Sequence, residues 1–269
     1  AAAHNSGGKV IFQVRGKVPR HSMKAREVRI PAALVDAVVV DATQRQGYDL
    51  VYDAALSGQD RRDDPEPPQP AFSSRLVIAR RAQQELHDNA VINFGFGIPD
   101  QIAKLIDRDG HAERYFQTIE HGTYGGRLMD GDLFGYAMNP SCMIDGPSQF
   151  DFYSGGGLDI AFLGFGEIDA AGNVNVSKLG GNTVGPGGFI DIAQNARKVV
   201  FCGTFDTGGA RLETGDGTLR VTSHGRIPKL VEKVDQITFS GPQASVQGQH
   251  VIYVTERAVF ELREDGVHL

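Results

Sequence analysis

The chain has 269 residues, of which 41% are hydrophobic, and its net charge is −6. This composition excludes a disordered chain and a collagen-like fibre, and the acidic balance argues against nucleic acid as a main partner. Glycine is the exception, because its 34 residues exceed the average share of about 7%. Glycine destabilises regular helices and strands, so the excess indicates many positions that need unusual backbone dihedral angles or close approach.

The N-terminal third contains two expected strands and a boundary. Residues Lys9–Val18 alternate in polarity and predict a strand, and the apolar stretch Ala32–Val40 predicts a buried strand. The first 30 residues carry seven positive charges and one negative charge, which suits either a phosphate-rich ligand or a solvated strand face. Residues 57–73 hold four prolines within six residues, so we expect a linker there.

Beyond residue 73 the pattern changes to alternating helices and strands. Ser73 or Ser74 is a suitable N-cap for a helix to about His87, and the apolar strand Ala90–Phe94 follows. Pro99 is well placed to open the next helix. Further strands are expected at Gln117–Glu120, Ile160–Phe165, Val174–Ser177, Lys198–Cys202, Gln236–Phe239 and Val251–Thr255. This alternation predicts an α/β fold with an open, mainly parallel sheet covered by helices.

Several classes of site lack support in the sequence. Apolar runs stay far below the roughly 18 residues of a membrane span, so we expect no membrane partner. Cys142 and Cys202 lack CxxC spacing and are interpreted as reduced core cysteines of a cytoplasmic protein. The eight histidines form no HxxxH or HExxH pair, so no metal site is expected.

Three segments have patterns that suit chemistry. The unit strand–Gly95-Phe96-Gly97–helix lacks the third glycine of a dinucleotide fingerprint, since Asp100 occupies that position, and a tight packing turn is favoured. Glu120 ends an apolar strand before a glycine-rich turn, where ligands bind in open α/β sheets. It suits a base, a metal ligand or a nucleophile, or alternatively a structural cap or the partner of a buried arginine.

The third segment is the glycine-rich loop at residues 172–189. Successive free backbone N–H groups in such a loop hold phosphates or stabilise a developing oxyanion. The alternative is a flexible surface loop, which the immediately following apolar pattern Phe189–Ile192 disfavours.

In their order and spacing, these motifs resemble the family I coenzyme A transferases. The resemblance is carried by Val91–Pro99, Glu120–Gly126 and Gly185–Phe189. The single-chain acetate/propionate type is most similar at Asp145–Gly157, Asn195–Thr204 and Val251–Phe260. The resemblance assigns residues 74–269 to the catalytic C-terminal domain and residues 1–56 to the closing segment of the N-terminal domain. The Pro-rich residues 57–73 would link the two.

The resemblance implies a nucleophile and a mechanism. The family's glutamate falls on Glu120, which would attack an acyl-CoA thioester and then accept CoA as a glutamyl-CoA thioester. The amides of Gly188 and Gly187 would form the oxyanion hole. Further residues implied to contact CoA or substrate are Gly95, Gly97, Gly122, Asn175, Gly185 and Phe189. Coenzyme A serves as substrate and covalent intermediate, with no permanently bound cofactor. His121 departs from the family, which usually has Asn or Ser there.

The same resemblance implies partners. We expect acyl-CoA and carboxylic acids of the acetate, propionate and acetoacetate class as substrates, a homo-oligomer, and a fragment that needs the N-terminal half of a longer enzyme. Two alternatives remain open: an acyl-CoA hydrolase that uses the same glutamate, and a non-catalytic ligand-binding module of the same fold.

Overall fold

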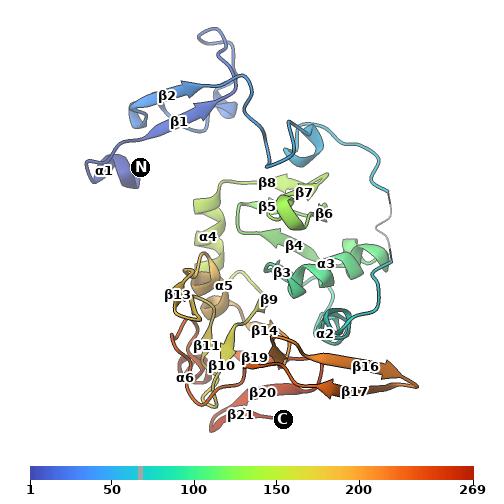
Figure 1. Cartoon of the computed structure of the whole chain (residues 1–269). Helices are drawn as coiled ribbons and strands as arrows, with labels where there is room; N and C mark the ends of the chain where they lie inside the picture. Colours follow the sequence, from blue (N-terminus) through green and yellow to red (C-terminus); the bar gives the residue numbers. More distant parts are fainter. Residues whose placement is uncertain (66–68) are drawn as a thin grey trace. The chain divides into compact units, whose positions relative to one another are not determined.

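The computed structural model describes residues 1–65 and 69–269, which form two compact units, Ala1–Asp53 and Ala54–Leu269. The first unit contains the short helix α1 (Ala2–Asn5) and two parallel strands, β1 (Ile11–Val14) and β2 (Ala37–Val40). The second unit contains the large sheet and the remaining helices (Figure 1).

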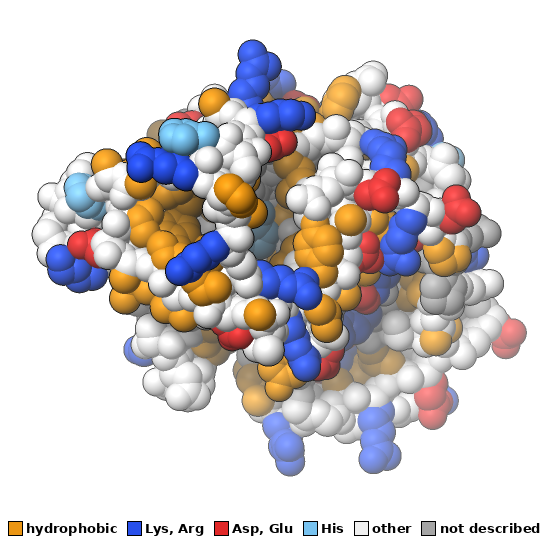
Figure 2. All heavy atoms as spheres, turned by 90° about the horizontal axis from the view of Figure 1, so that it is seen from above, with side chains coloured by type: hydrophobic (Ala, Val, Ile, Leu, Met, Phe, Trp, Pro, Cys, Tyr) orange, Lys and Arg blue, Asp and Glu red, His pale blue; other side chains and the backbone are white. Residues whose placement is uncertain are grey.

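The buried strand expected at Ala32–Val40 is wrong in both extent and burial. Residues Ala32–Leu34 form a 3-10 turn, and the strand β2 is exposed along its whole length. Val38 is 53% exposed, and Ile11 on the neighbouring β1 is 65% exposed. Apolar β-branched residues form the strand, but this unit has no further layer to cover it within residues 1–53. Apolar side chains accordingly lie open among Lys and Arg side chains on the face seen in Figure 2.

The second unit is organised around a nine-stranded mixed sheet. Its strands, in spatial order, are β21 (Gly266–His268), β20 (Val259–Arg263), β19 (His250–Val254), β14 (Lys198–Cys202), β9 (Ile160–Gly164), β3 (Val91–Phe94), β4 (Phe116–Ile119), β5 (Thr123–Tyr124) and β8 (Cys142–Met143). The five central strands, from β19 to β4, are parallel, and the outer strands are antiparallel. The α/β class expected from the sequence is therefore confirmed.

Helices cover both faces of this sheet, because successive side chains of each central strand point to opposite sides. Ile160 and Phe162 pack in one cluster with helices α2 (Ser74–Gln83) and α3 (Ile98–Arg108). Ala161 and Leu163 pack in the other cluster, which contains residues of the three helices α4 (Gly146–Ser154), α5 (Phe189–Asn195) and α6 (Gly241–Val246). The sheet is thus the middle layer of three (Figure 1).

The structure confirms the predicted starts of helices α2 and α3. Ser73 caps α2 by accepting a hydrogen bond from the Leu76 amide at 3.2 Å, although the helix ends at Gln83 instead of His87. Pro99 lies in the first turn of α3. The strand expected at Gln236–Phe239 is wrong, because this segment is irregular and its one β-bridge among the described residues joins Phe239 to Val174.

The expected linker contains no helix or strand at residues 57–65 and 69–73, and residues 66–68 lie outside the described part. Its first half belongs to the second unit. Asp64 forms an ion pair with Arg127, with its Oδ2 2.7 Å from Nε, and the Arg62 backbone exchanges two hydrogen bonds with the Asn139 amide. The assignment of the two units to the halves of the family stays a prediction.

Short antiparallel ribbons connect the larger elements. They are β6 (Arg127–Leu128) with β7 (Ala137–Met138), β10 (Glu167–Ile168) with β11 (Val174–Asn175), β12 (Lys178–Leu179) with β13 (Asn182–Thr183), β15 (Asp206–Thr207) with β18 (Ile227–Pro228), and β16 (Arg211–Gly215) with β17 (Thr218–Ser223). Residues of four of these ribbon strands and of the turn after β12 line the site described next.

Candidate active site

A pocket of about 770 Å³ lies at the carboxyl ends of β3, β4 and β9. Gly95 and Phe96 reach it directly after β3, Glu120 directly after β4, and Phe165 to Glu167 directly after β9. This is the edge of a parallel sheet at which open α/β folds bind ligands. Its size suits a ligand considerably larger than acetate, since small-molecule pockets usually span about 300–1,000 Å³.

The half-buried carboxylate of Glu120 is attached to a buried polar network. Asn93 on β3 donates from Nδ2 to Oε2 of Glu120 at 3.3 Å, and also to the hydroxyl of Tyr153 on α4 at 3.3 Å. The Tyr153 hydroxyl lies 2.6 Å from Oγ1 of Thr118 on β4. Burial, with a smaller contribution from the nearby Glu120 charge, raises the pKa of Tyr153 to about 12. Glu120 is therefore held from the strand beside its own and from a helix on one face.

The glycine-rich loop brings backbone to the same pocket. Pro186, Gly187 and Gly188 line it, and Gly188 is the N-cap of α5. Among the described residues no acceptor meets the N–H of Gly187 or Gly188, so both amides are free to donate to a ligand. The loop is anchored by the Ser177 carbonyl, which accepts from Val184 and Gly185 at 2.8 and 3.0 Å. These two hydrogen bonds tie residues 184 and 185 to the segment that follows β11.

The predicted site residues divide into two groups. The pocket is lined by Gly95, Glu120, Gly187, Gly188 and Phe189. The pocket lining does not include Gly97, Gly122, Asn175 and Gly185.

The residues of the second group have structural contacts instead. Gly97 precedes α3, and its N–H donates to the Asp100 carboxylate at 3.1 Å. A Cβ on Gly122 would lie 2.2 Å from the Ile144 carbonyl oxygen, so that glycine permits close backbone approach. Asn175 is buried beneath the pocket and donates to Oε2 of Glu167 at 2.7 Å, which orients a second carboxylate of the lining.

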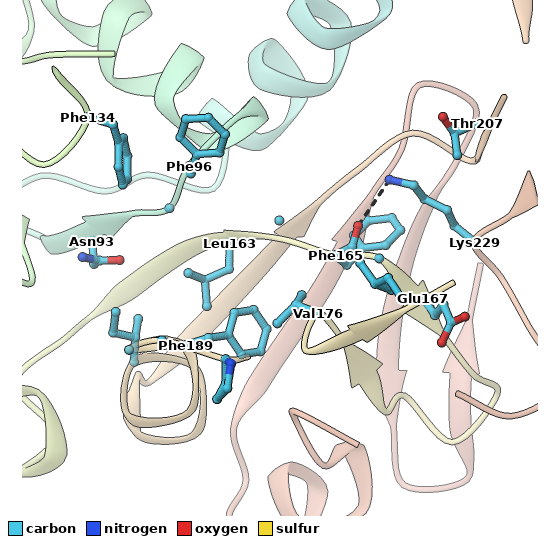
Figure 3. Close-up of a pocket in the computed structure, with 18 of the residues that line it drawn as sticks. Asn93, Phe96, Phe134, Leu163, Phe165, Glu167, Val176, Phe189, Thr207 and Lys229 are labelled. Carbon is cyan, nitrogen blue, oxygen red and sulfur yellow. Dashed lines mark hydrogen bonds between the residues drawn. The ribbon is translucent and has the colours of Figure 1, made fainter. Parts of the chain in front are cut away.

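Sequence reasoning missed most of the side chains that shape the pocket. They are Phe96, Phe134, Leu163, Phe165, Val176, Leu179, Ile227 and Lys229. In Figure 3, Asn93, Phe96 and Phe134 lie toward one end, and Lys229 and Thr207 lie toward the other. These residues come from segments that are distant in the sequence, so no local spacing pattern predicts that they line one pocket.

Lys229 is the cationic group of this pocket. Its Nζ donates to the Phe165 carbonyl oxygen at 3.2 Å (Figure 3) and lies 5.2 Å from the centre of the Phe165 ring. Burial lowers the pKa of Lys229, against the attraction of the Glu256 carboxylate. No carboxylate among the described residues forms an ion pair with it, so its charge is available to an anionic or carbonyl-bearing ligand.

His121 does not line the pocket. Its Nδ1 lies 3.2 Å from the Gly135 carbonyl oxygen, and a Cβ on Gly135 would lie 2.6 Å from the ring. The residue after Glu120 therefore holds the 121–138 segment in place.

Neither a metal-binding cluster nor a membrane-spanning helix is present among the described residues. Residues 1–65 and 69–269 hold no group of three His, Cys, Asp or Glu side chains placed to bind a metal ion. No helix in the same part of the chain is long and apolar enough to cross a membrane.

Comparison with known proteins gives concordant matches. No family model matches the chain. The acetate CoA-transferase YdiF of Escherichia coli O157:H7 is 43% identical over 269 residues, which are 100% of this chain and 51% of that protein. The caffeate CoA-transferase of Acetobacterium woodii is 42% identical over 97% of this chain and 51% of its own length. The chain thus spans about half the length of these curated relatives.

The solved structures agree. The crystal structure of the acyl-CoA transferase YdiF from E. coli O157:H7, in its complex described as a thioester with CoA, superposes with a TM-score of 0.88 at 42% identity. The match covers 99% of this chain and 49% of that one. Over its whole length the chain is thus similar in sequence and in fold to about half of these CoA-transferases.

Proposed function

We propose that the chain is the catalytic half of an enzyme that transfers CoA between a short-chain acyl-CoA and a carboxylic acid, through a thioester on Glu120. One observation carries the proposal: the Glu120 carboxylate shares a pocket with the Gly187 and Gly188 backbone, whose N–H groups have no other acceptor among the described residues. The names of the relatives support the reaction class, and the thioester complex of YdiF supports a covalent intermediate.

The proposed reaction proceeds in balanced steps. One carboxylate oxygen of Glu120 attacks the thioester carbon and expels the CoA thiolate. The product of this step is an acyl-glutamyl anhydride. The thiolate then attacks the glutamyl carbonyl and expels the free acid, which leaves a glutamyl-CoA thioester. A second carboxylate reverses both steps and departs as the new acyl-CoA. CoA is substrate and covalent intermediate, and charge is conserved because one anion replaces another at each step.

A carboxylate is a weak nucleophile, so the site must stabilise the transition state of its attack. The Gly187 and Gly188 amides supply part of this stabilisation. Each attack creates an oxyanion, and a preorganised backbone donor at such an oxyanion contributes about 3–4 kcal/mol to transition-state stabilisation. Binding of the remote parts of CoA supplies a further share. The pocket volume leaves room for such a longer ligand portion, and its apolar walls at Leu163, Phe165 and Val176 suit the alkyl parts of that ligand.

The proposal includes an N-terminal half in addition to this chain. Parallel strands are normally buried on both faces, whereas β1 and β2 are exposed. An N-terminal domain that includes β1 and β2 would supply the layers that bury their two faces. A homo-oligomer and a cytoplasmic location stay predictions.

Intact-mass analysis tests the proposal. The enzyme containing this chain and its N-terminal half is incubated with acetyl-CoA, and we expect a mass gain of one CoA less one water. Glu120→Gln should abolish the adduct. Glu167→Gln is the matched control, because Glu167 is a second carboxylate of the same pocket and should leave the adduct intact. An adduct that survives Glu120→Gln, or turnover without any adduct, would contradict the mechanism. Steady release of free CoA without added acid would favour the hydrolase alternative.

A further inference from the structure

The pocket has two ends that differ in chemistry. The polar end carries the hydroxyl of Thr207, the carboxylate of Glu167 and the ammonium of Lys229 (Figure 3). The aromatic end carries the rings of Phe96 and Phe134. One end therefore offers hydrogen-bond donors and acceptors, and the other offers apolar ring surface.

The nucleophile lies at the aromatic end. Glu120 accepts a hydrogen bond from Asn93 at 3.3 Å, and Asn93 lies toward the same end as the two rings. An acyl-CoA bound at Glu120 has two arms that leave the reacting carbon, namely the acyl group and the pantetheine arm. The amides of the pantetheine arm need hydrogen-bond partners when they leave water, so this arm suits the polar end. The acyl group then takes the aromatic end.

The two rings present an open aromatic surface. Their centroids are 5.3 Å apart and their planes meet at 81°, which is the edge-to-face arrangement that aromatic pairs favour. Phe96 is nevertheless 66% exposed, so a face of its ring is open to a ligand. A large exposed apolar side chain at the edge of a pocket is typical of a binding surface.

The backbone holds both rings in place. The N–H of Phe134 donates to the Gly131 carbonyl oxygen at 3.1 Å, and the carbonyl oxygen of the residue after Phe134 lies 3.2 Å from the His121 ring. Directly before Phe96, the N–H of Gly95 donates to a carbonyl oxygen of β9 at 2.8 Å. A preorganised surface of this kind loses little conformational entropy when a ligand binds.

We propose that Phe96 and Phe134 form the acyl subsite, and that this subsite favours carboxylic acids with a flat aryl or conjugated group beside the carboxyl. The inference rests on the function proposed above and names its substrate class. A flat ring stacks on the open aromatic surface, which contributes to binding beyond the apolar area that it buries. A saturated ring of the same size buries a similar area but has no π-system to stack.

An internal competition measures this preference. The enzyme containing this chain and its N-terminal half is loaded with CoA from acetyl-CoA, and equal concentrations of benzoate and cyclohexanecarboxylate are then added together. Both acids discharge the same glutamyl-CoA, so the initial ratio of benzoyl-CoA to cyclohexanecarbonyl-CoA equals the ratio of their kcat/KM values. This product ratio depends neither on the folded fraction of the enzyme nor on the rate of loading.

Two variants remove one ring each and keep an apolar side chain, namely Phe96→Leu and Phe134→Leu. Each should lower the product ratio by about 3- to 10-fold, which corresponds to the contribution of an aromatic pair beyond its buried area. Phe165→Leu is the matched control, because the Phe165 ring lines the same pocket but contacts Lys229 of the polar end. Its product ratio should equal that of the wild type.

The outcomes separate this inference from the function on which it rests. A wild-type enzyme that forms no CoA adduct refutes the proposed function. An adduct that neither acid discharges overturns the acyl subsite alone, as does an unchanged product ratio in both Phe96→Leu and Phe134→Leu. An equal shift in Phe165→Leu overturns it too, because the preference would then not belong to the aromatic end. Should Phe134→Leu fail to fold, the exposed Phe96 still allows Phe96→Leu to decide.

Discussion

Asp107 near the end of α3 gives the sharpest prediction about stability. Its Oδ2 is buried without a partner among the described residues, and burial raises the pKa of Asp107 from 3.8 to about 7. Arg127 lowers the pKa only in part, because its guanidinium already binds Asp64. The folded chain therefore keeps a proton on Asp107 that the unfolded chain has released.

The sign of the effect follows directly. Stability falls as pH rises from about 4 to 7, since the unfolded state binds fewer protons in that range, and it levels off above pH 7. The full effect is about 4 kcal/mol, of which about 3 kcal/mol accumulates between pH 5 and pH 8. Asp107→Asn removes the ionisation at constant shape. Its stability relative to wild type should therefore increase by about 3 kcal/mol between those two pH values.

Urea unfolding of both proteins at pH 5 and pH 8 measures this difference. Asp109→Asn is the matched control two residues away, because its hydrogen bond from Arg80 lowers the pKa of Asp109. That stabilisation is complete above pH 4 and is lost only in more acid solution, so the control should lose the same stability at pH 5 and pH 8. An Asp107→Asn advantage that does not grow between pH 5 and pH 8 would refute the burial argument.

The remaining predictions concern the loop and the residue after Glu120. Gly187 has a φ of +56° and open space at the Cβ position. Gly187→Ala should therefore cost only about 1–2 kcal/mol of unfolding free energy but lower kcat more than 10-fold by shifting the pocket amides. In Gly188→Ala the new Cβ would lie 2.8 Å from the Phe150 ring, so unfolding free energy and kcat should both fall; equal effects of the two variants would contradict this reasoning. His121→Ala should leave kcat within about 3-fold and cost about 1 kcal/mol of stability, because the ring contacts Gly135 and not the pocket; a large drop in kcat would place His121 in the reaction.

The central α/β unit was predictable because its signals are local. An apolar run, a serine cap and a proline each act within one turn, and they place β3, α2 and α3 within a few residues. Burial was less predictable. Ala32–Val40 has the composition of a core strand, yet its exposure depends on which other segments exist to cover it. The same reason explains Gln236–Phe239, whose backbone finds only one bridging partner.

The site residues that belong to short sequence motifs were predictable. Glu120, Gly187 and Gly188 were named from sequence and lie in one pocket. Asn93 was part of a quoted motif, but no function was assigned to it, because its importance depends on Tyr153 some 60 positions later. A contact of that separation has no spacing rule, so only the fold could reveal it.

The glycine excess divides into two physical causes once the fold is known. Some glycines near the site, such as Gly187, leave open space at the position of a Cβ, and their value is the free amide and the unusual dihedral angles. Others pack backbone against backbone: a Cβ on Gly122 or on Gly126 would lie within 2.4 Å of a carbonyl oxygen. Gly122, two residues after Glu120, thereby lets the turn approach the Ile144 backbone, and Gly126 lets the chain approach Met138 on β7. The two groups therefore serve one site by different means, since the first supplies donors to the pocket and the second fixes the backbone that carries the nucleophile.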